Sequence, residues 1–139
     1  MSAAFVVDCS VAMTWLFNDE ATPQTAELLG RLATESALVP TWWFVEVANV
    51  LAIAERKSRI AAAQSIAFIS DLDKLDIQSD DDGPGRAFAH LLPLCREHQL
   101  TSYDAVYLDL ALRRGLPLAT LDQQLRKAAK KMGVKLLGQ

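Results

Sequence analysis

The sequence predicts an α/β protein, a three-layer α/β/α domain around a central, mainly parallel five-stranded sheet. Five short apolar segments alternate with longer segments that follow the helical period. Strands separated by helices are typical of a parallel sheet whose two faces are covered by those helices. The length of 139 residues and a hydrophobic content of 51% suit one domain, residues 1–139, with a well-filled core.

The first half of the chain predicts two strands and three helices. Short apolar runs at residues 4–8 and 37–40 are typical of buried strands. Pro23 stands where a first helical residue is expected, because proline lacks the N–H that a helix start leaves unpaired. The expected helices cover residues 11–17, 23–33 and 42–56. Their expected N-caps are Ser10, Thr22 and Thr41.

The second half continues the alternation. A strand is expected at residues 75–77, and residues 80–85 predict a loop because aspartate, glycine and proline break regular elements. Gly115 and Gly133 are typical helix stops. The remaining expected helices cover residues 60–73, about 86–98, 104–114 and 121–132, and the remaining strands cover residues 116–120 and 134–137. The expected core positions of the helix at 60–73 are Ile66, Ile69 and Leu72.

Four acidic residues stand where a parallel fold would direct them to one edge of the sheet. Asp8 and Asp122 follow strands, Asp104 begins a helix, and Glu46 lies about one turn into an apolar helix. Ligands of open parallel sheets bind outside the carboxyl ends of the strands. Because neighbouring buried carboxylates repel one another, a shared cation is the simplest way to stabilise such a cluster. The pattern therefore predicts a divalent-metal site.

Each acid also has a structural interpretation. Asp8, Asp104 and Asp122 could each cap the helix that follows. Glu46 could lie on a solvent-facing stripe of its helix. Asp109 is about 140° round the helix from Asp104, so we expect it to face solvent or to support the site from outside.

Three polar residues could support the acids. Asn49 lies near the same helical face as Glu46, three residues later. The hydroxyl of Thr120 could bind a carboxylate, a water or a phosphate oxygen, or cap the last helix. Ser10 has the same two interpretations near Asp8.

Positive charge is concentrated near the end of a chain whose net charge is −3. Residues 113–139 hold seven basic residues and one acid, so this segment carries +6. Such a segment beside an acidic site suits a bound polyanion, although a solvated helix face would look the same. The cations that could contact a nucleic-acid backbone are Arg113, Arg114, Arg126, Lys127 and Lys130.

The remaining composition indicates a reduced, cytoplasmic protein. The two cysteines, Cys9 and Cys95, form no CxxC pair. No signal peptide is apparent, and no apolar run approaches the roughly 20 residues that a membrane-spanning helix needs.

The acidic motifs together resemble PIN-domain ribonucleases, specifically the VapC-type toxins of bacterial toxin–antitoxin pairs, over nearly the whole chain. The loops that contact the substrate differ among members of this family, so the resemblance does not predict which RNA this protein would cut. Cys9 is a small departure from the family pattern that leaves the acids unchanged. The matching segments are Val6-Val7-Asp8-Cys9-Ser10, Glu46-Val47-Ala48-Asn49-Val50-Leu51, Tyr103-Asp104-Ala105-Val106-Tyr107-Leu108 and Leu118-Ala119-Thr120-Leu121-Asp122.

The resemblance implies a catalytic metal site made of Asp8, Glu46, Asp104 and Asp122, supported by Ser10, Asn49 and Thr120. Oxygen ligands alone favour Mg²⁺ or Mn²⁺, as one or two ions, which would activate water for hydrolysis of an RNA phosphodiester. The resemblance also implies products with 5′-phosphate and 3′-hydroxyl ends, a cognate antitoxin protein and a toxin homodimer.

Two other functions are considered. A receiver-like signalling module would bind Mg²⁺ and be phosphorylated on an aspartate, but the acidic pair after the first strand and the acceptor aspartate on the middle strand are missing. A catalytically silent PIN-fold binding protein would not need all four acids, which this chain has.

Overall fold

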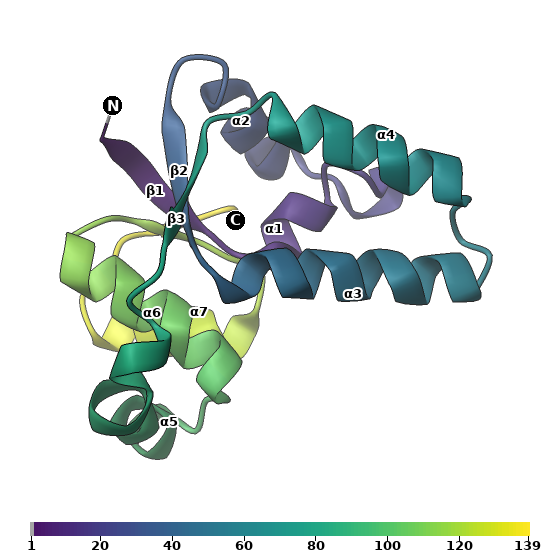
Figure 1. Cartoon of the computed structure of the whole chain (residues 1–139). Helices are drawn as coiled ribbons and strands as arrows, with labels where there is room; N and C mark the ends of the chain where they lie inside the picture. The colour runs from purple at the N-terminus through teal and green to yellow at the C-terminus, as the bar shows by residue number, and fades with distance from the viewer. Residues whose placement is uncertain (1) are drawn as a thin grey trace.

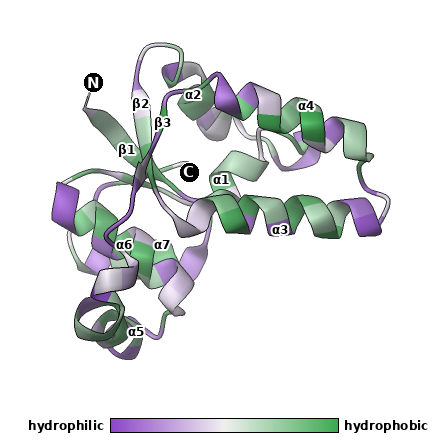
Figure 2. Ribbon diagram, in the orientation of Figure 1, coloured by the Kyte–Doolittle hydropathy of each residue, from purple (hydrophilic) through white to green (hydrophobic). Residues whose placement is uncertain are grey.

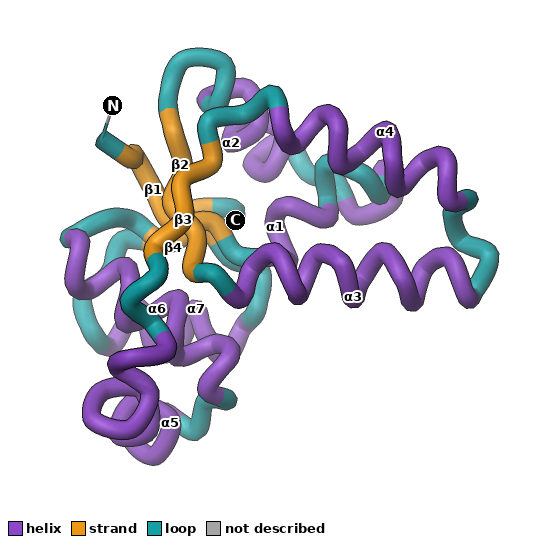
Figure 3. The backbone as a smooth tube through the Cα atoms, in the orientation of Figure 1, coloured by secondary structure: helices purple, strands orange, loops and turns teal. Residues whose placement is uncertain are grey.

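The structure, a computed structural model, describes residues 2–139 as one sheet surrounded by helices (Figures 1 and 3). The strands are β1 (Ala3–Val7), β2 (Ser36–Pro40), β3 (Ile77–Asp80), β4 (Leu118–Ala119) and β5 (Leu136–Leu137). The α-helices are α1 (Cys9–Met13), α2 (Pro23–Arg31), α3 (Trp42–Arg56), α4 (Ala62–Asp73), α5 (Leu92–His98), α6 (Ser102–Arg114) and α7 (Gln123–Lys131). Short helical segments are η1 (Asn18–Glu20), η2 (Pro84–Arg86) and η3 (Ala87–Leu91).

The five strands pair in the order β3-β2-β1-β4-β5, and every pairing is parallel. The predicted parallel α/β architecture is therefore confirmed. β1 lies at the centre, with β2 and β3 on one side and β4 and β5 on the other. The direction of strand order reverses between β1 and β4, and a crevice at such a point is the usual ligand site of an open α/β sheet.

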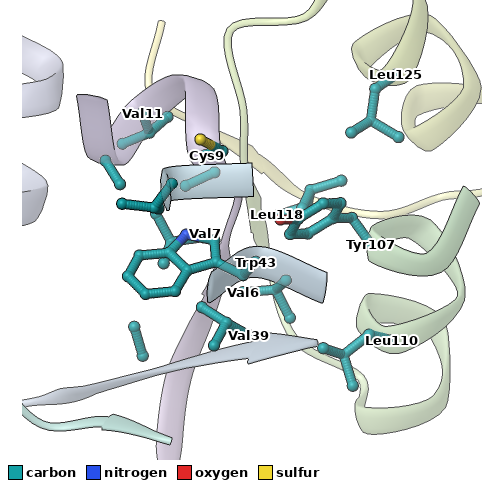
Figure 4. Close-up of a cluster of buried hydrophobic side chains, with 14 of the residues drawn as sticks. Val6, Val7, Cys9, Val11, Val39, Trp43, Tyr107, Leu110, Leu118 and Leu125 are labelled. Atoms are coloured by element: carbon teal, nitrogen blue, oxygen red, sulfur yellow. The ribbon is translucent and has the colours of Figure 1, made fainter. Parts of the chain in front are cut away.

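Helices cover both faces of the sheet, with α1 to α4 on one side and α5 to α7 on the other (Figure 1). The central strand is apolar and has no exposed surface at Phe5, Val6 and Val7. Figure 4 shows Trp43 of α3 beside Val7, with Tyr107 projecting from α6. Burial of these side chains on both faces holds the end of β1 in a fixed position. No helix among residues 2–139 combines the length and the apolar character needed to cross a membrane.

Several local predictions are confirmed and others are wrong. Thr22 caps α2 and forms a capping box with Thr25, as the proline after it suggested. However, α1 begins at Cys9 with Asp8 as its N-cap, and the side chain of Thr41 makes no capping hydrogen bond. β3 lies at Ile77–Asp80 rather than residues 75–77, because its register is set by pairing with β2.

Helix α4 turns a different face to the core than the sequence predicted. Ser65 and Phe68 are buried, whereas Ile66 and Ile69 are 69% and 47% exposed. The Ser65 hydroxyl donates a 2.6 Å hydrogen bond to Glu55 of α3, which satisfies it inside the contact. Apolar residues occur on more than one face of α4, so the helical period alone did not identify the buried one. Figure 2 shows hydrophobic residues along most of α3 and in the middle of α4.

Arginines and aspartates join β3, η2 and α6 in one ion-pair network. Arg113 contacts Asp80 at 3.0 Å and Asp109 at 3.1 Å. Arg86 adds a 2.7 Å contact to Asp109, and Arg114 adds a 3.0 Å contact to Asp80. The prediction that Asp109 faces solvent is therefore wrong: it is 4% exposed and belongs to this network.

Candidate active site

The centre of the site lies where β1 and β4 end side by side. Asp8 follows β1 and is 5% exposed, and Thr120 follows β4 and is fully buried. The Thr120 hydroxyl donates a short hydrogen bond to the Asp8 carboxylate, although the two residues are 112 positions apart. The strand pairing of Val7 with Ala119 brings them together. The acid thus stands at the point where strand order reverses.

Hydrogen bonds fix the Asp8 carboxylate in one orientation. Ser10 donates from its hydroxyl at 2.6 Å, and the backbone N–H of Val11 donates at 3.2 Å. The Ser10 hydroxyl in turn accepts the backbone N–H of Leu121 at 3.0 Å. Asp8 therefore caps α1 and also takes part in a network that spans two strands, so its structural and functional interpretations are compatible.

Asp122 reaches the same region from the loop after β4. Its carboxylate accepts the backbone N–H of Leu125 at 2.8 Å and so caps α7. Its own backbone N–H donates to the Thr120 hydroxyl at 3.0 Å. Thr120 thus contacts both aspartates, Asp8 through its proton and Asp122 through its oxygen.

Glu46 approaches from α3 and is held by a tyrosine of α6. The Tyr107 hydroxyl donates a 2.6 Å hydrogen bond to Oε1 of Glu46. Tyr107 is 1% exposed, whereas Glu46 is only partly buried, so the tyrosine fixes a carboxylate that remains accessible. Asn49, one helical turn further along α3, is exposed. Its predicted support of Glu46 stays a prediction.

Asp104 completes the set from the first turn of α6. The N-cap of that helix is Thr101, whose hydroxyl accepts the Asp104 backbone N–H at 3.2 Å. Asp104 is therefore not the cap that one interpretation proposed. Its half-buried side chain interacts electrostatically with the other three acids.

Three of the four acids have pKa values raised above the ordinary range, mainly by burial. Burial raises the pKa of Asp8 to about 6, helped by the charge of Asp104 and opposed by the hydrogen bonds of its neighbours. Burial also raises the pKa of Glu46 to about 7; the bond from Tyr107 opposes this, and the charges of Asp8 and Asp104 add to it. Burial and the charge of Asp122 raise the pKa of Asp104. The charges of neighbouring acids thus add to the effect of burial at all three positions.

The donor set suits a hard divalent cation. Four carboxylates whose charges repel would be stabilised by Mg²⁺ or Mn²⁺, which prefer oxygen ligands. Among residues 2–139, no three acid, histidine or cysteine side chains already stand at the separations of a complete metal cluster. The residues that would hold the ion are the four acids, and Ser10, Thr120 and Tyr107 would orient them.

A cleft of about 430 Å³ opens beside these residues. Ser10 and Asp122 line it from the side of the acids, and Arg59 lines it from the loop before α4. Arg59 lies over the ring of Phe17 at 3.7 Å and pairs with Glu20 of η1 at 2.8 Å. A group entering this cleft would meet Asp122 on one side and, on the other, Arg59 with its ion-pair partners Asp19 and Glu20.

Sequence reasoning missed Tyr107 and Arg59, and it did not foresee that three of the proposed RNA-contacting arginines bind groups within the chain. Arg113 and Arg114 bind Asp80 within the chain. Arg126 donates to the carbonyl oxygens of Thr120 and Leu137, at 2.7 and 2.9 Å. We therefore keep only the exposed Lys127 and Lys130 as proposed contacts to a nucleic-acid backbone. A tyrosine three residues after Asp104 was the one signal that pointed to Tyr107.

Without metal, the free energy of unfolding should fall as pH rises from 5 to 8. The folded-state pKa values of Asp8 and Glu46 lie above their ordinary values of 3.8 and 4.5. Their stabilising contribution is therefore complete at low pH and is lost as pH passes through about 6 and 7. We expect a loss on the order of 2 kcal/mol, measured by urea denaturation in EDTA.

The Asp8→Asn variant is the control for this measurement. It should show a shallower decline, because one of the two titrating groups is gone. Mg²⁺ should restore stability to the wild-type protein mainly at the higher pH, where the carboxylates are ionised. A wild-type profile that is flat or rises between pH 5 and 8 would contradict the prediction.

The chain matches the PIN domain family over residues 5–131. It belongs to the PIN-domain family. PIN domains are generally nucleases, so the acids lie in a fold that supports phosphodiester hydrolysis. No curated protein shows significant similarity to the chain.

Two solved structures share the fold. PAE2754 from Pyrobaculum aerophilum is 22% identical, with a TM-score of 0.70 over 96% of this chain and 83% of that one. VapBC2 from Rickettsia felis, bound to a DNA fragment from its promoter, is 9% identical, with a TM-score of 0.66 over 96% of both chains. At these identities the likeness concerns the fold alone.

Proposed function

We propose that this PIN domain is a metal-dependent endoribonuclease of the VapC type, the toxin of a toxin–antitoxin pair. The observation that carries the proposal is a buried carboxylate, Asp8, at the reversal of strand order, together with electrostatic interactions among it and acids from three other parts of the chain. Charge repulsion makes such a group costly unless it serves a cation. The acids are Asp8, Glu46, Asp104 and Asp122.

The residues of the chain would hold and orient the reacting groups. One or two Mg²⁺ or Mn²⁺ ions, when bound, supply an activated water and stabilise charge on the phosphate oxygens. Thr120 and Ser10 fix the Asp8 carboxylate, and Tyr107 fixes Glu46. No histidine base is needed. The expected products carry 5′-phosphate and 3′-hydroxyl ends.

Two exposed lysines on the helix that Asp122 caps support an RNA substrate. Lys127 and Lys130 lie on α7, which begins at Gln123 directly after Asp122. Contacts of this kind hold the phosphate backbone without reading sequence, and they make binding weaker as salt increases.

An apolar groove of about 300 Å³ between α3, α4 and β3 supports a protein partner. Trp43, Phe44, Leu51 and Ile69 are among its lining residues, and Phe44 and Ile69 are 50% and 47% exposed. Exposed apolar surface of this kind is typical of protein interfaces. We propose a cognate antitoxin as the occupant, in line with the VapBC2 neighbour, and a toxin homodimer as the assembly.

The topology argues against a receiver-like module. Receiver domains have the strand order 2-1-3-4-5, whereas this sheet has the order 3-2-1-4-5. A catalytically silent PIN-fold binding protein would keep the fold but would show no acid-dependent cleavage.

Purified protein should cut RNA in Mg²⁺ or Mn²⁺ and should be inactive in EDTA. The measurement is gel analysis of total RNA and of single-stranded DNA incubated with each ion, followed by mapping of the cut ends. Discrete RNA fragments with 5′-phosphates would support the proposal. Intact RNA with either ion, from protein that binds the ion, would favour the silent binding protein.

A further inference from the structure

Two exposed aromatic rings stack against each other on the two helices that carry Glu46 and Asp104. Trp42 of α3 and Tyr103 of α6 have ring centroids 4.8 Å apart and planes inclined by 17°. They are 39% and 53% exposed, which is unusual for large rings in a chain with a well-filled core. Their mutual contact holds both rings in place while leaving ring surface open to solvent.

The ring pair lies next to the acids in both helices. Trp42 is four residues before Glu46, so the two lie about one helical turn apart on the same face of α3. Tyr103 directly precedes Asp104. Glu46 follows Trp42 by four residues on α3, and Tyr107 follows Tyr103 by four residues on α6. The Tyr107 hydroxyl donates a hydrogen bond to Glu46. The helices α3 and α6 therefore meet at two successive contacts, one between the aromatic rings and one at the carboxylate.

The rings also border a small apolar hollow of about 170 Å³. Trp42 and Tyr103 form part of its wall, together with Pro84 of η2 and Val106 of α6. An exposed, pre-ordered aromatic surface beside a hollow suits a flat partner that can lie against a ring. Among the groups that accompany a phosphodiester, the nucleobase has this shape, and base stacking on aromatic side chains is a general mode of single-strand binding.

We propose that Trp42 and Tyr103 form a stacking platform for an unpaired base adjacent to the scissile phosphate. The platform rests on the proposed nuclease function and adds to it two side chains that position the strand, which they can do only where a base is unpaired. A paired base cannot leave its own stack without a cost in unpairing energy, so duplex RNA would bind less tightly. Because every base has an aromatic face, the platform holds the strand with little sequence preference.

The experiment measures binding of a fluorescein-labelled 12-nucleotide RNA that spans a cut site mapped with the wild-type protein. Fluorescence anisotropy is recorded with Ca²⁺ in place of Mg²⁺, so that the carboxylates are neutralised, and gels check that the RNA stays intact. The protein variants are Trp42→Leu, Trp42→Phe, Tyr103→Leu and Phe88→Leu. Matched RNAs carry one abasic nucleotide at each position flanking the cut.

We expect Trp42→Leu and Tyr103→Leu each to weaken binding about 5- to 100-fold, because stacking is lost. Trp42→Phe should largely restore it. Phe88 is 90% exposed on η3 and is not among the residues that line the hollow, so Phe88→Leu should bind like wild type. An abasic nucleotide at one flanking position should weaken binding to wild type but hardly affect binding to Trp42→Leu.

Three outcomes would overturn the platform. If Trp42→Leu and Tyr103→Leu bind the RNA as wild type does, while wild type cuts it, the nuclease stands and the platform fails. If these variants lose a dimer in sedimentation but keep RNA binding, the rings form a protein contact instead. If abasic nucleotides have no effect on wild type, no base stacks there, and this result does not depend on whether any variant folds. Absence of any cut site would instead overturn the nuclease itself.

Discussion

Asp8→Asn should lower metal-dependent RNA cleavage about 10²- to 10⁴-fold, because it removes a charged oxygen ligand from the proposed metal site. Asp8 is the most completely buried of the four acids and lies at the centre of their hydrogen-bond network. An asparagine has the same shape but no charge. Its amide therefore cannot replace the carboxylate in balancing a divalent cation.

The same variant should remain folded, which separates catalysis from stability. Asparagine is as good an N-cap as aspartate, so α1 keeps its hydrogen bond from Val11. The hydroxyls of Ser10 and Thr120 can each donate or accept, so they adapt to an amide. Removal of a buried charge with a raised pKa should even stabilise the metal-free protein at neutral pH.

Single-turnover cleavage in Mg²⁺ and thermal unfolding of each variant are the two measurements. Asp71→Asn is the matched control, because Asp71 is 74% exposed on α4 and lies outside the site. It should cut RNA at the wild-type rate. Cleavage by Asp8→Asn within a fewfold of wild type would show that the acid cluster is not the catalytic centre. When expressed in cells, the wild-type protein and Asp71→Asn should arrest growth, and Asp8→Asn should not.

Arg113→Ala should destabilise the protein by about 2 to 4 kcal/mol without acting on the site directly. Arg113 binds Asp80 and Asp109, whose side chains are 2% and 6% exposed. Its loss would leave two buried carboxylates with fewer partners. Arg114 and Arg86 remain beside them, so the expected loss lies below that of an isolated buried ion pair.

Urea denaturation at pH 7 measures this loss. Burial raises the pKa values of Asp80 and Asp109, but hydrogen bonds from the arginines outweigh it and hold both below their ordinary values. The contribution of these pairs is therefore present at neutral pH and is lost as pH falls through the acidic range. Arg96→Ala, at an exposed position of α5, is the control and should change stability little. Equal stability of both variants would refute the structural role of Arg113.

Local sequence signals predicted most of the elements. Pro23 after Thr22 and glycine after the last turn of α6 act within a few residues, so they could be recognised without knowledge of the fold. The alternation of strands and helices predicted a parallel sheet. That prediction placed Asp8 and Asp122 at the same edge, because the carboxyl ends of parallel strands lie together.

Contacts between distant residues could not be predicted in the same way. The hydrogen bond from Tyr107 to Glu46 joins residues 61 positions apart, and the burial of Asp109 depends on Arg86 in another element. On α4, apolar residues face both the core and solvent, so only packing against α3 selected Phe68 over Ile66. Similarly, the sequence did not show which basic residues near the C-terminus bind groups within the chain and which remain exposed.

The sequence by itself determined the order of the elements, the parallel sheet and the four acids at its edge, because these follow from local periodicity and from strand direction. The tertiary structure alone decided which groups hold those acids and which charges are already paired. Ser10 and Thr120 reach Asp8 only after β1 and β4 pair, and Arg113 is paired only after β3 approaches α6. Such contacts depend on three-dimensional distance, which a one-dimensional pattern does not contain.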